Sequence, residues 1–431
     1  MFIMKIYIDP EKNTWQQILQ RPAIDYKQLE STVSVILADV KLHGDVAVQK
    51  YTQQFDGVAS DELQVTEKEI TAAALLVDAD LKTAIELAKN NITAFHASQK
   101  EEVKQIETAN GVLCWRRSVA IESVGLYIPG GSAPLFSTLL MLGIPALLAG
   151  CRDIVVCTPP DKNGDVNPVI LYVAQLIGIK KIYKAGGVQA IAAMAYGTEA
   201  ITKVNKIFGP GNQYVTCAKQ LVNAGGIAID MPAGPSELAV FADESCYPSF
   251  VAADLLSQAE HGADSQVILV ASSALIAEQV KDEIEKQLSL LPRKEIAAAA
   301  LQNSRAIVMN EAKTAFDLLN EYAPEHLIIA SDNAAALAEN VVNAGSVFLG
   351  HYSPESAGDY ASGTNHTLPT NGYAKAYSGV SLDSFVKKIT FQQISKTGIQ
   401  TIGNAVEAMA AAEGLEAHKN AVTIRLNALK K

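Results

Sequence analysis

The sequence has few cysteines and no block of basic residues. Its 431 residues include 5 cysteines, at positions 114, 151, 157, 217 and 246, an odd number with irregular spacing and no CxxC pair. This spacing excludes a zinc ribbon and argues against a disulfide framework, so we expect buried thiols in a reduced compartment, the cytoplasm. With 35 Lys+Arg against 46 Asp+Glu the net charge is −11, so neither nucleic acid nor an anionic membrane surface is an expected partner.

A secretory signal and a membrane span are not predicted either. Residues 1–10 hold too few apolar residues before Lys5 to form the apolar region of a signal peptide. The uncharged run 123–151 is long enough to cross a bilayer, but the glycines and prolines of IPGGSAP near its start would leave backbone groups unpaired in lipid. We expect a buried strand, a glycine turn and a core helix in this run.

The spacing of apolar residues predicts an α/β protein. Apolar positions three and four apart indicate helices over 29–57 and 67–99. Beyond them, short apolar strands alternate with helices at roughly the length of a βα unit, which predicts parallel sheets covered by helices. The pattern resumes after MPAGPSE (231–237), so we expect two α/β sheets in series. The tail 399–431 is predicted to form two helices separated at Gly414.

A segment rich in Gly, Ser, Thr and Pro (353–373) follows the last predicted strand, and we expect it to form a loop. Open α/β sheets build their sites beyond the carboxyl ends of strands, so this loop is a candidate site. Asp359 stands there among small residues, where its carboxylate can approach a cation. Taken alone, an ordinary turn aspartate is the simpler interpretation.

Two further motifs carry candidate chemistry. In SQAEHG, a helix reaching about residue 262 would place Gln258 and His261 on one face, where both can reach one ion, with Gly262 as the helix stop. An ordinary polar helix end explains the same residues, and the zinc-protease signature HExxH is absent. In APEHLII, Glu325 and His326 open an apolar strand, where burial shifts pKa values as acid–base catalysis requires. The alternative is a solvated strand entrance.

Glycine-rich turns give a weaker indication of a nucleotide site. YIPGGSAP and FGPGNQY fit close approach of a backbone to phosphate. Neither is a GxGxxG fingerprint, and no acidic residue follows at the spacing that grips a ribose.

Taken in order, the motifs resemble those of the histidinol dehydrogenase family over essentially the whole chain. The segments that carry the resemblance are VGLYIPGGSAPLFST, FGPGN, DMPAGPSE, DLLSQAEHG, PEHLI, GSVFLG, SPESAGDYASGTNHTLPT and EAHKNAV. The resemblance implies a homodimeric zinc enzyme that oxidises L-histidinol through L-histidinaldehyde to L-histidine with two NAD. It implies a catalytic water-activating base, Glu325, and a proton acceptor and donor, His326. The implied zinc ligands are Gln258, His261, Asp359 and His418. The implied substrate contacts are these four residues together with Ser236, His326 and Glu413. The implied NAD contacts are Tyr127, Gln189 and Asn212.

The resemblance also implies the domain organisation. Two incomplete Rossmann-like domains are expected, with small helical N- and C-terminal segments. The expected boundaries are 1–23 for the N-terminal segment, 24–126 with 238–380 for the first α/β domain, 127–237 for the inserted domain and 381–431 for the C-terminal helical domain. Because Glu413 and His418 lie on the helical tail, we expect the tail to dock on a neighbouring copy and complete its site.

Two other functions use the same residues. A zinc-dependent hydrolase or deaminase would activate a metal-bound water and need no nicotinamide. A zinc-stabilised binding protein would turn over no nucleotide and would place Glu325 at a polar surface. An assay for NADH formation from histidinol separates both from a dehydrogenase.

Overall fold

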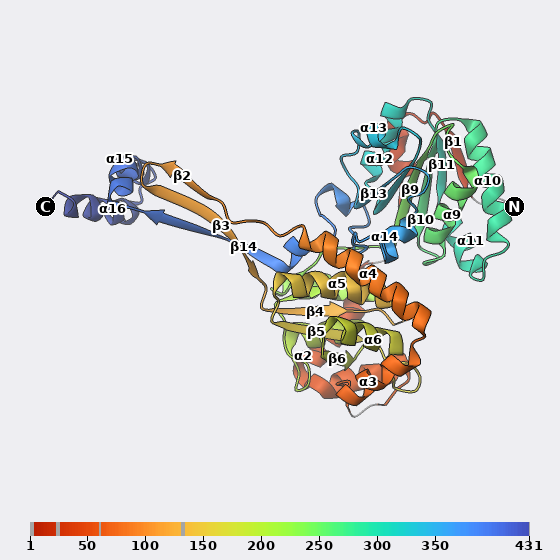
Figure 1. The fold of residues 1–431 in the computed structure, drawn as a ribbon, viewed down its shortest axis with the longest axis horizontal. Coiled ribbons are helices and arrows are strands. Elements are labelled where there is room, and N and C mark those ends of the chain that lie inside the picture. The colour runs from red at the N-terminus through yellow and green to blue at the C-terminus, as the bar shows by residue number, and fades with distance from the viewer. Residues whose placement is uncertain (1–3, 23–25, 60–61, 131–133, 431) are drawn as a thin grey trace.

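The computed structural model describes residues 4–22, 26–59, 62–130 and 134–430 (Figure 1). Among these residues the strands form three sheets: one of six strands, one of five and one of three. The two larger sheets are covered by helices and form two α/β units that lie next to each other. A narrow arm built on the third sheet projects from them and ends with the C-terminus (Figure 1).

The six-stranded sheet has the order β1-β11-β10-β9-β12-β13, and all neighbouring strands are parallel. Its strands are β1 Lys5–Ile8, β9 Glu237–Ala242, β10 Gln266–Ala271, β11 Arg305–Val308, β12 His326–Ala330 and β13 Ser346–Leu349. One face packs on α9 Pro248–Ala259, α10 Ala274–Leu288 and α11 Lys294–Gln302, and the other on α1 Trp15–Ile18, α12 Ala312–Tyr322 and α13 Ala334–Ala338. Because both faces are covered, β9, β10 and β12 are buried throughout.

The five-stranded sheet has the order β6-β5-β4-β7-β8 and is also wholly parallel. Its strands are β4 Ser123–Tyr127, β5 Asp153–Thr158, β6 Lys181–Lys184, β7 Lys206–Phe208 and β8 Ala228–Ile229. One core joins it to α3 Glu67–Leu76, α4 Ala79–Ala97, α5 Phe136–Ala149 and α6 Pro168–Ile177. The other core joins it to α2 Tyr26–Asp56, α7 Gly187–Tyr196 and α8 Gln213–Ala224.

The two parallel sheets share one topology. Counted along the chain, the five strands of the smaller sheet have the order third, second, first, fourth, fifth. Strands β9 to β13 repeat this order, with β1 added at the edge beside β11. It is the order of an incomplete Rossmann fold, in which the connections reverse direction between the first and fourth strands. The prediction of two incomplete Rossmann-like domains is confirmed, and the reversal points lie between β4 and β7 and between β9 and β12.

The arm consists of an antiparallel sheet and two helices. Strand β3 Val112–Ala120 pairs with β2 Gln105–Ala109 and with β14 Val386–Ile394. Helices α15 Lys396–Ala412 and α16 Glu416–Ala428 follow and pack against each other. Gly414 lies between them in the left-handed region (φ 71°), as the predicted break requires.

Three predicted domain assignments differ from the observed packing. Helices α2, α3 and α4, which lie within 24–126, pack in the cores of the five-stranded sheet, and of residues 238–380 helix α4 contacts the segment 361–365, where Asn91 donates to the Ala361 carbonyl at 2.8 Å. The segment 1–23 contributes strand β1 to the six-stranded sheet. The segment 381–431 is not wholly helical, because it includes β14 of the arm. An amphipathic pattern shows that a helix buries one face, but it does not show which sheet that face covers.

The uncharged run 123–151 forms β4 and helix α5, as predicted, with residues 131–133 of its glycine turn outside the described residues. No helix in the described parts of the chain is long and apolar enough to cross a membrane.

Candidate active site

The candidate site lies at the amino ends of strands β9 and β12, which are neighbours in the six-stranded sheet. Glu237 begins β9, and His326 begins β12. Helix α9 starts beyond the carboxyl end of β9 and runs back, so Gln258 in its last turn returns to the amino edge. The predicted location beyond the carboxyl ends of this sheet is therefore wrong, because the helices that follow the strands carry the site residues back.

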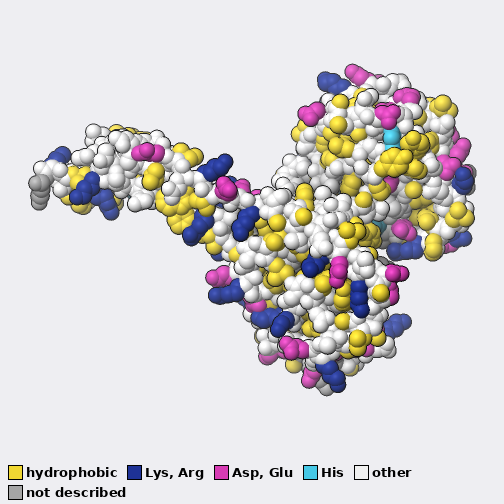
Figure 2. Space-filling model, viewed as in Figure 1, with side chains coloured by type: hydrophobic (Ala, Val, Ile, Leu, Met, Phe, Trp, Pro, Cys, Tyr) yellow, Lys and Arg dark blue, Asp and Glu magenta, His cyan; other side chains and the backbone are white. Residues whose placement is uncertain are grey.

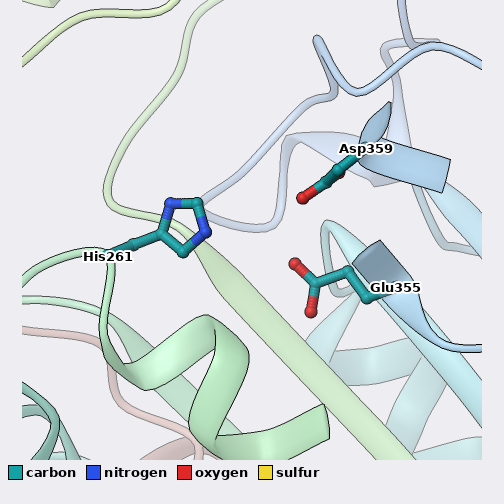
Figure 3. A group of neighbouring side chains, drawn as sticks. All are labelled: His261, Glu355 and Asp359. Atoms are coloured by element: carbon teal, nitrogen blue, oxygen red, sulfur yellow. The ribbon is translucent and has the colours of Figure 1, made fainter. Parts of the chain in front are cut away.

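Three side chains of this edge form a cluster that could hold a metal ion. One ligand atom each from His261, Glu355 and Asp359 lies within 4.8 Å of the others (Figure 3). The two carboxylates come from one short helix, α14 Glu355–Tyr360, and their spacing of four residues puts both on one side of it. Figure 3 shows the imidazole and both carboxylates turned toward a common space.

Two local predictions about these elements are wrong. The segment 353–373, predicted as a loop, contains α14, so Asp359 lies in a helix and not in a turn. Helix α9 ends at Ala259, three residues before the predicted stop at Gly262. His261 therefore follows the helix, and its main-chain N–H donates to the Gln258 carbonyl at 3.3 Å, which keeps the two residues together.

The buried Gln258 side chain completes the cluster. In one amide orientation its oxygen faces the oxygens of the Glu355 carboxyl group, with no N–H group between them. In the other orientation its NH2 group donates to Glu355 and its oxygen accepts from the Glu237 N–H at 3.0 Å. A cation between the oxygens would relieve the first arrangement, and amide, carboxylate and imidazole donors suit zinc.

Burial sets the protonation of these groups. Desolvation raises the pKa of Asp359 to about 7. Desolvation also raises the pKa of Glu355 well above its usual range, and the neighbouring charges of Asp359 and Glu325 raise it further. Desolvation lowers the pKa of His326 to about 3, that of His366 to about 4, and also lowers that of His261. The imidazoles are therefore neutral at pH 7, with lone pairs available, among carboxyl groups that a cation would ionise.

Glu325 and His326 are buried, with 7% and 3% of their surfaces exposed, so the solvated strand entrance is excluded. Glu325 Oε2 accepts a hydrogen bond from the Glu237 N–H at 2.9 Å. His326 Nδ1 donates to the Glu237 carbonyl at 3.3 Å. This hydrogen bond fixes the tautomer, so Nε2 carries the lone pair and can accept a proton. Nε2 lies 3.7 Å from Asp359 Oδ1 and has no hydrogen-bond partner among the described residues.

Residues of the 353–373 segment join this edge to the other α/β unit. His366 Nδ1 donates to the Asp359 carbonyl at 2.9 Å, and its Nε2 accepts from Thr138 Oγ1 at 3.1 Å in the first turn of α5. Asn365 donates to the Met141 carbonyl of the same helix at 2.7 Å. Because α5 follows β4, the amino edge of the six-stranded sheet faces the carboxyl edge of the five-stranded sheet, with α14 at the junction (Figure 1).

The three predicted NAD contacts lie at that carboxyl edge. Tyr127 ends β4, and its hydroxyl accepts from the Gly187 N–H at 3.1 Å. Gln189 is buried in the first turn of α7, and Asn212 caps α8 through hydrogen bonds from the main-chain N–H groups of its first turn. These residues surround the reversal point between β4 and β7, where parallel α/β sheets bind nucleotides.

The remaining predicted residues divide into two groups. Ser236 precedes Glu237 at the amino edge of β9, beside the cluster. Glu413 caps α15 and His418 lies on α16; both are exposed on the arm, which the chain holds away from the cluster (Figure 1). One chain thus brings together Ser236 with the cluster and with Glu325 and His326, but not the two tail residues.

Sequence reasoning missed Glu355. Its signal was the spacing of four residues to Asp359, which would have been informative had a helix been predicted there.

Comparisons with known proteins show the family of the chain. A family model described as histidinol dehydrogenase matches residues 19–426. The chain is 60% identical over 428 residues to a histidinol dehydrogenase of Bacteroides thetaiotaomicron, covering 99% of this chain and 100% of that one. It is 51% identical over 415 residues to one of Vibrio parahaemolyticus, covering 96% and 95%. The crystal structure of histidinol dehydrogenase from Elizabethkingia anophelis superimposes with a TM-score of 0.98 at 57% identity, covering 100% of both chains. The chain belongs to the histidinol dehydrogenase family.

Proposed function

We propose that this oxidoreductase depends on zinc and uses NAD to oxidise L-histidinol to L-histidinaldehyde and then to L-histidine. The observation that carries the proposal is the meeting of two edges: a cluster of side chains that could hold a metal ion faces the carboxyl edge of a Rossmann-like sheet, where such sheets bind nucleotides. Since the family is one of dehydrogenases, the hydrolase and the non-catalytic binding protein are set aside. The five free thiols support a reduced compartment, the cytoplasm.

The zinc ligands in this proposal are Gln258, His261 and Asp359 of one chain and His418 of a second copy. The cluster geometry, the two facing acceptors at Gln258 and the neutral imidazoles support the first three. Zinc would hold and orient the imidazole and amino nitrogens of the substrate, which leaves acid–base chemistry to other residues. Ser236 and Glu413 would contact the substrate from the two sides of the shared pocket.

Two residues move the protons. In the first oxidation His326 Nε2 accepts the proton of the substrate hydroxyl. Its tautomer is fixed by the Nδ1 hydrogen bond, and Nε2 has no hydrogen-bond partner among the described residues, so this nitrogen is available for the task. In the second, Glu325 takes a proton from the water that adds to the aldehyde, and His326 takes the proton of the resulting hydrate. Tyr127, Gln189 and Asn212 would hold NAD, which when bound would supply the hydride acceptor for each oxidation.

The proposal for the metal predicts a loss of zinc with each ligand. Single replacement of Gln258, His261, Asp359 or His418 should lower the zinc content of the purified protein and abolish turnover, while the melting temperature stays close to that of the wild type. Metal analysis and thermal melting check both parts. His43→Asn is the control, because His43 is exposed on α2, where its Nδ1 pairs with Asp39 at 2.7 Å. A His261→Asn protein with full zinc and full activity would refute the ligand set.

The proposal for NAD predicts an effect on one substrate only. Gln189 is 1% exposed, and its Oε1 has no hydrogen-bond partner within the described ranges. If this atom accepts a hydrogen bond from NAD, Gln189→Ala should raise the KM for NAD by about 3–10-fold, the value of one hydrogen bond. The KM for histidinol should stay unchanged. A rise in the KM for histidinol alone would contradict the assignment.

A homodimer is the proposed assembly. None of the residues of α16 is buried in the described chain, so this helix has no core of its own. Apolar side chains gather along the surface of the arm (Figure 2), and among them Ile106, Met409, Leu415 and Ile424 are exposed. An exposed apolar surface of this kind suits a second copy. The site also lacks Glu413 and His418 of its own chain, which a partner arm would supply.

A further inference from the structure

Arg21, in the segment after α1, makes a set of buried contacts below the candidate site. Its Nε donates to Glu237 Oε1 at 2.5 Å, and its Nη2 donates to Glu237 Oε2 at 2.9 Å, a two-point contact that fits a planar guanidinium. Nη2 also donates to the Tyr322 carbonyl at 2.7 Å, and the guanidinium lies 4.1 Å from the centre of the Tyr322 ring. One arginine therefore ties three separate segments together.

Glu237 transmits this contact to both catalytic side chains. Its carboxylate is 3% exposed and also accepts from the Asn371 N–H at 2.8 Å. Its main-chain N–H donates to Glu325 Oε2, and its carbonyl accepts from His326 Nδ1. The position of the Glu237 main chain therefore sets where the Glu325 carboxylate lies.

Tyr322 is the second connection. It ends α12, and the next residue, Ala323, adopts the left-handed conformation (φ 51°, ψ 66°) that a residue with a Cβ rarely takes. This turn leads through Pro324 to Glu325. By binding the Tyr322 carbonyl, Arg21 holds the beginning of the turn whose end presents Glu325.

The positive charge of Arg21 lies against the carboxylate of Glu237. Glu237 lies near Glu325, and the pKa of Glu325 is raised by desolvation, the larger cause, and by the charge of Glu237. Without the guanidinium, Glu237 would be a buried anion without its counter-ion, a strongly unfavourable state that its surroundings would have to move to relieve.

We propose that Arg21 is a positioning residue for Glu325: through the Glu237 main chain and the Tyr322 turn it holds the water-activating carboxylate from two sides. The proposal rests on the role of Glu325 in aldehyde oxidation given above. His326 shares only the Glu237 connection, so alcohol oxidation depends on Arg21 less.

The test compares the two half-reactions in the zinc-loaded enzyme, with histidinol or histidinaldehyde supplied as the substrate. Arg21→Met should slow aldehyde oxidation by about 10–100-fold, the cost of a small misplacement of a catalytic group, and alcohol oxidation by about tenfold less. In a Glu325→Gln background, adding Arg21→Met should slow aldehyde oxidation by less than about 3-fold, because the group it positions is already gone. Arg21→Lys, which keeps the charge but not the two-point contact, should lie between wild type and Arg21→Met.

Arg305→Met is the matched control. Arg305 begins strand β11 of the six-stranded sheet and donates to the main-chain carbonyls of Gln302 and Ser304, away from Glu325 and His326. Its loss should therefore leave the ratio of the rates of aldehyde and alcohol oxidation unchanged. If Arg21→Met does not fold, Arg21→Lys alone and with Glu325→Gln carries the same comparison.

Equal losses in both half-reactions, or an undiminished loss in the Glu325→Gln background, would show a general structural role and overturn the proposal. If Glu325→Gln slowed aldehyde oxidation and Arg21→Met did not, the positioning role of Arg21 alone would be overturned. Undiminished aldehyde oxidation by Glu325→Gln would overturn the role of Glu325 itself and the present inference with it.

Discussion

Replacing Glu325 by glutamine should leave oxidation of histidinol to the aldehyde largely intact and slow oxidation of the aldehyde to the acid by about 10²–10⁴-fold, the usual contribution of a general base. Glutamine has nearly the same shape and can still accept the hydrogen bond from the Glu237 N–H. It cannot take a proton from water. The measurement is the rate of NADH formation with each substrate supplied separately.

His326→Asn is the companion variant for this test. Its imidazole is the proposed proton acceptor in both steps, so both rates should fall. If Glu325→Gln instead reduced the two rates equally, Glu325 would have a role common to both steps, and the assignment made here would be wrong.

Two inactive variants should restore activity when their subunits exchange. In a dimer of His261→Asn and His418→Asn chains, one site has lost both ligands, whereas the other keeps both if His261 and His418 of each site come from different chains. Activity should return toward half of the wild-type value per mixed dimer. The exposed position of His418 on the arm, apart from the cluster of its own chain, motivates the prediction.

The control for this experiment is each inactive variant taken alone through the same exchange protocol, which should remain inactive. Mixed dimers are detected by a purification tag carried on one of the two chains. If mixed dimers form and no activity returns, both ligands of a site belong to one chain, and the shared site is refuted.

The sheets were predictable because buried parallel strands appear as continuous apolar runs. LAVFA at 238–242 and VILVA at 267–271 are such runs, and both are buried along their whole length. The glycine turn after β7 was predictable because it needs a backbone that only glycine allows. Gly209 has φ 126°, and a Cβ there would collide with the Tyr127 carbonyl, so the backbone can approach this closely only without a side chain.

The sheet edge that carries the candidate site was not predictable from local pattern. Gln258 and His261 return to the amino edge because α9 runs back across the sheet, which is a property of the tertiary path. Helices α2 to α4 have clear amphipathic patterns, but those patterns do not specify a partner sheet.

Two residues show how local rules give way to tertiary context. Pro324 predicts extended geometry for Ala323, yet Ala323 is left-handed because it caps α12, its N–H donating to the Leu319 carbonyl at 2.8 Å. The composition of 353–373 predicts a loop, yet α14 forms there and buries Glu355 against Gln258 and His326. In both places the exception helps to build the site.

The stoichiometry and metal dependence of NADH formation test the central claim most directly. The claim is that one zinc site facing one nucleotide edge carries both oxidations. The measurement counts NADH formed for each L-histidinol consumed, for the zinc-loaded enzyme, after removal of the metal by a chelator, and after zinc is restored. We predict two NADH for each histidinol with zinc, none after its removal, and recovery when zinc returns. Full turnover by protein shown to be free of metal, or one NADH with the aldehyde released as the final product, would contradict the account.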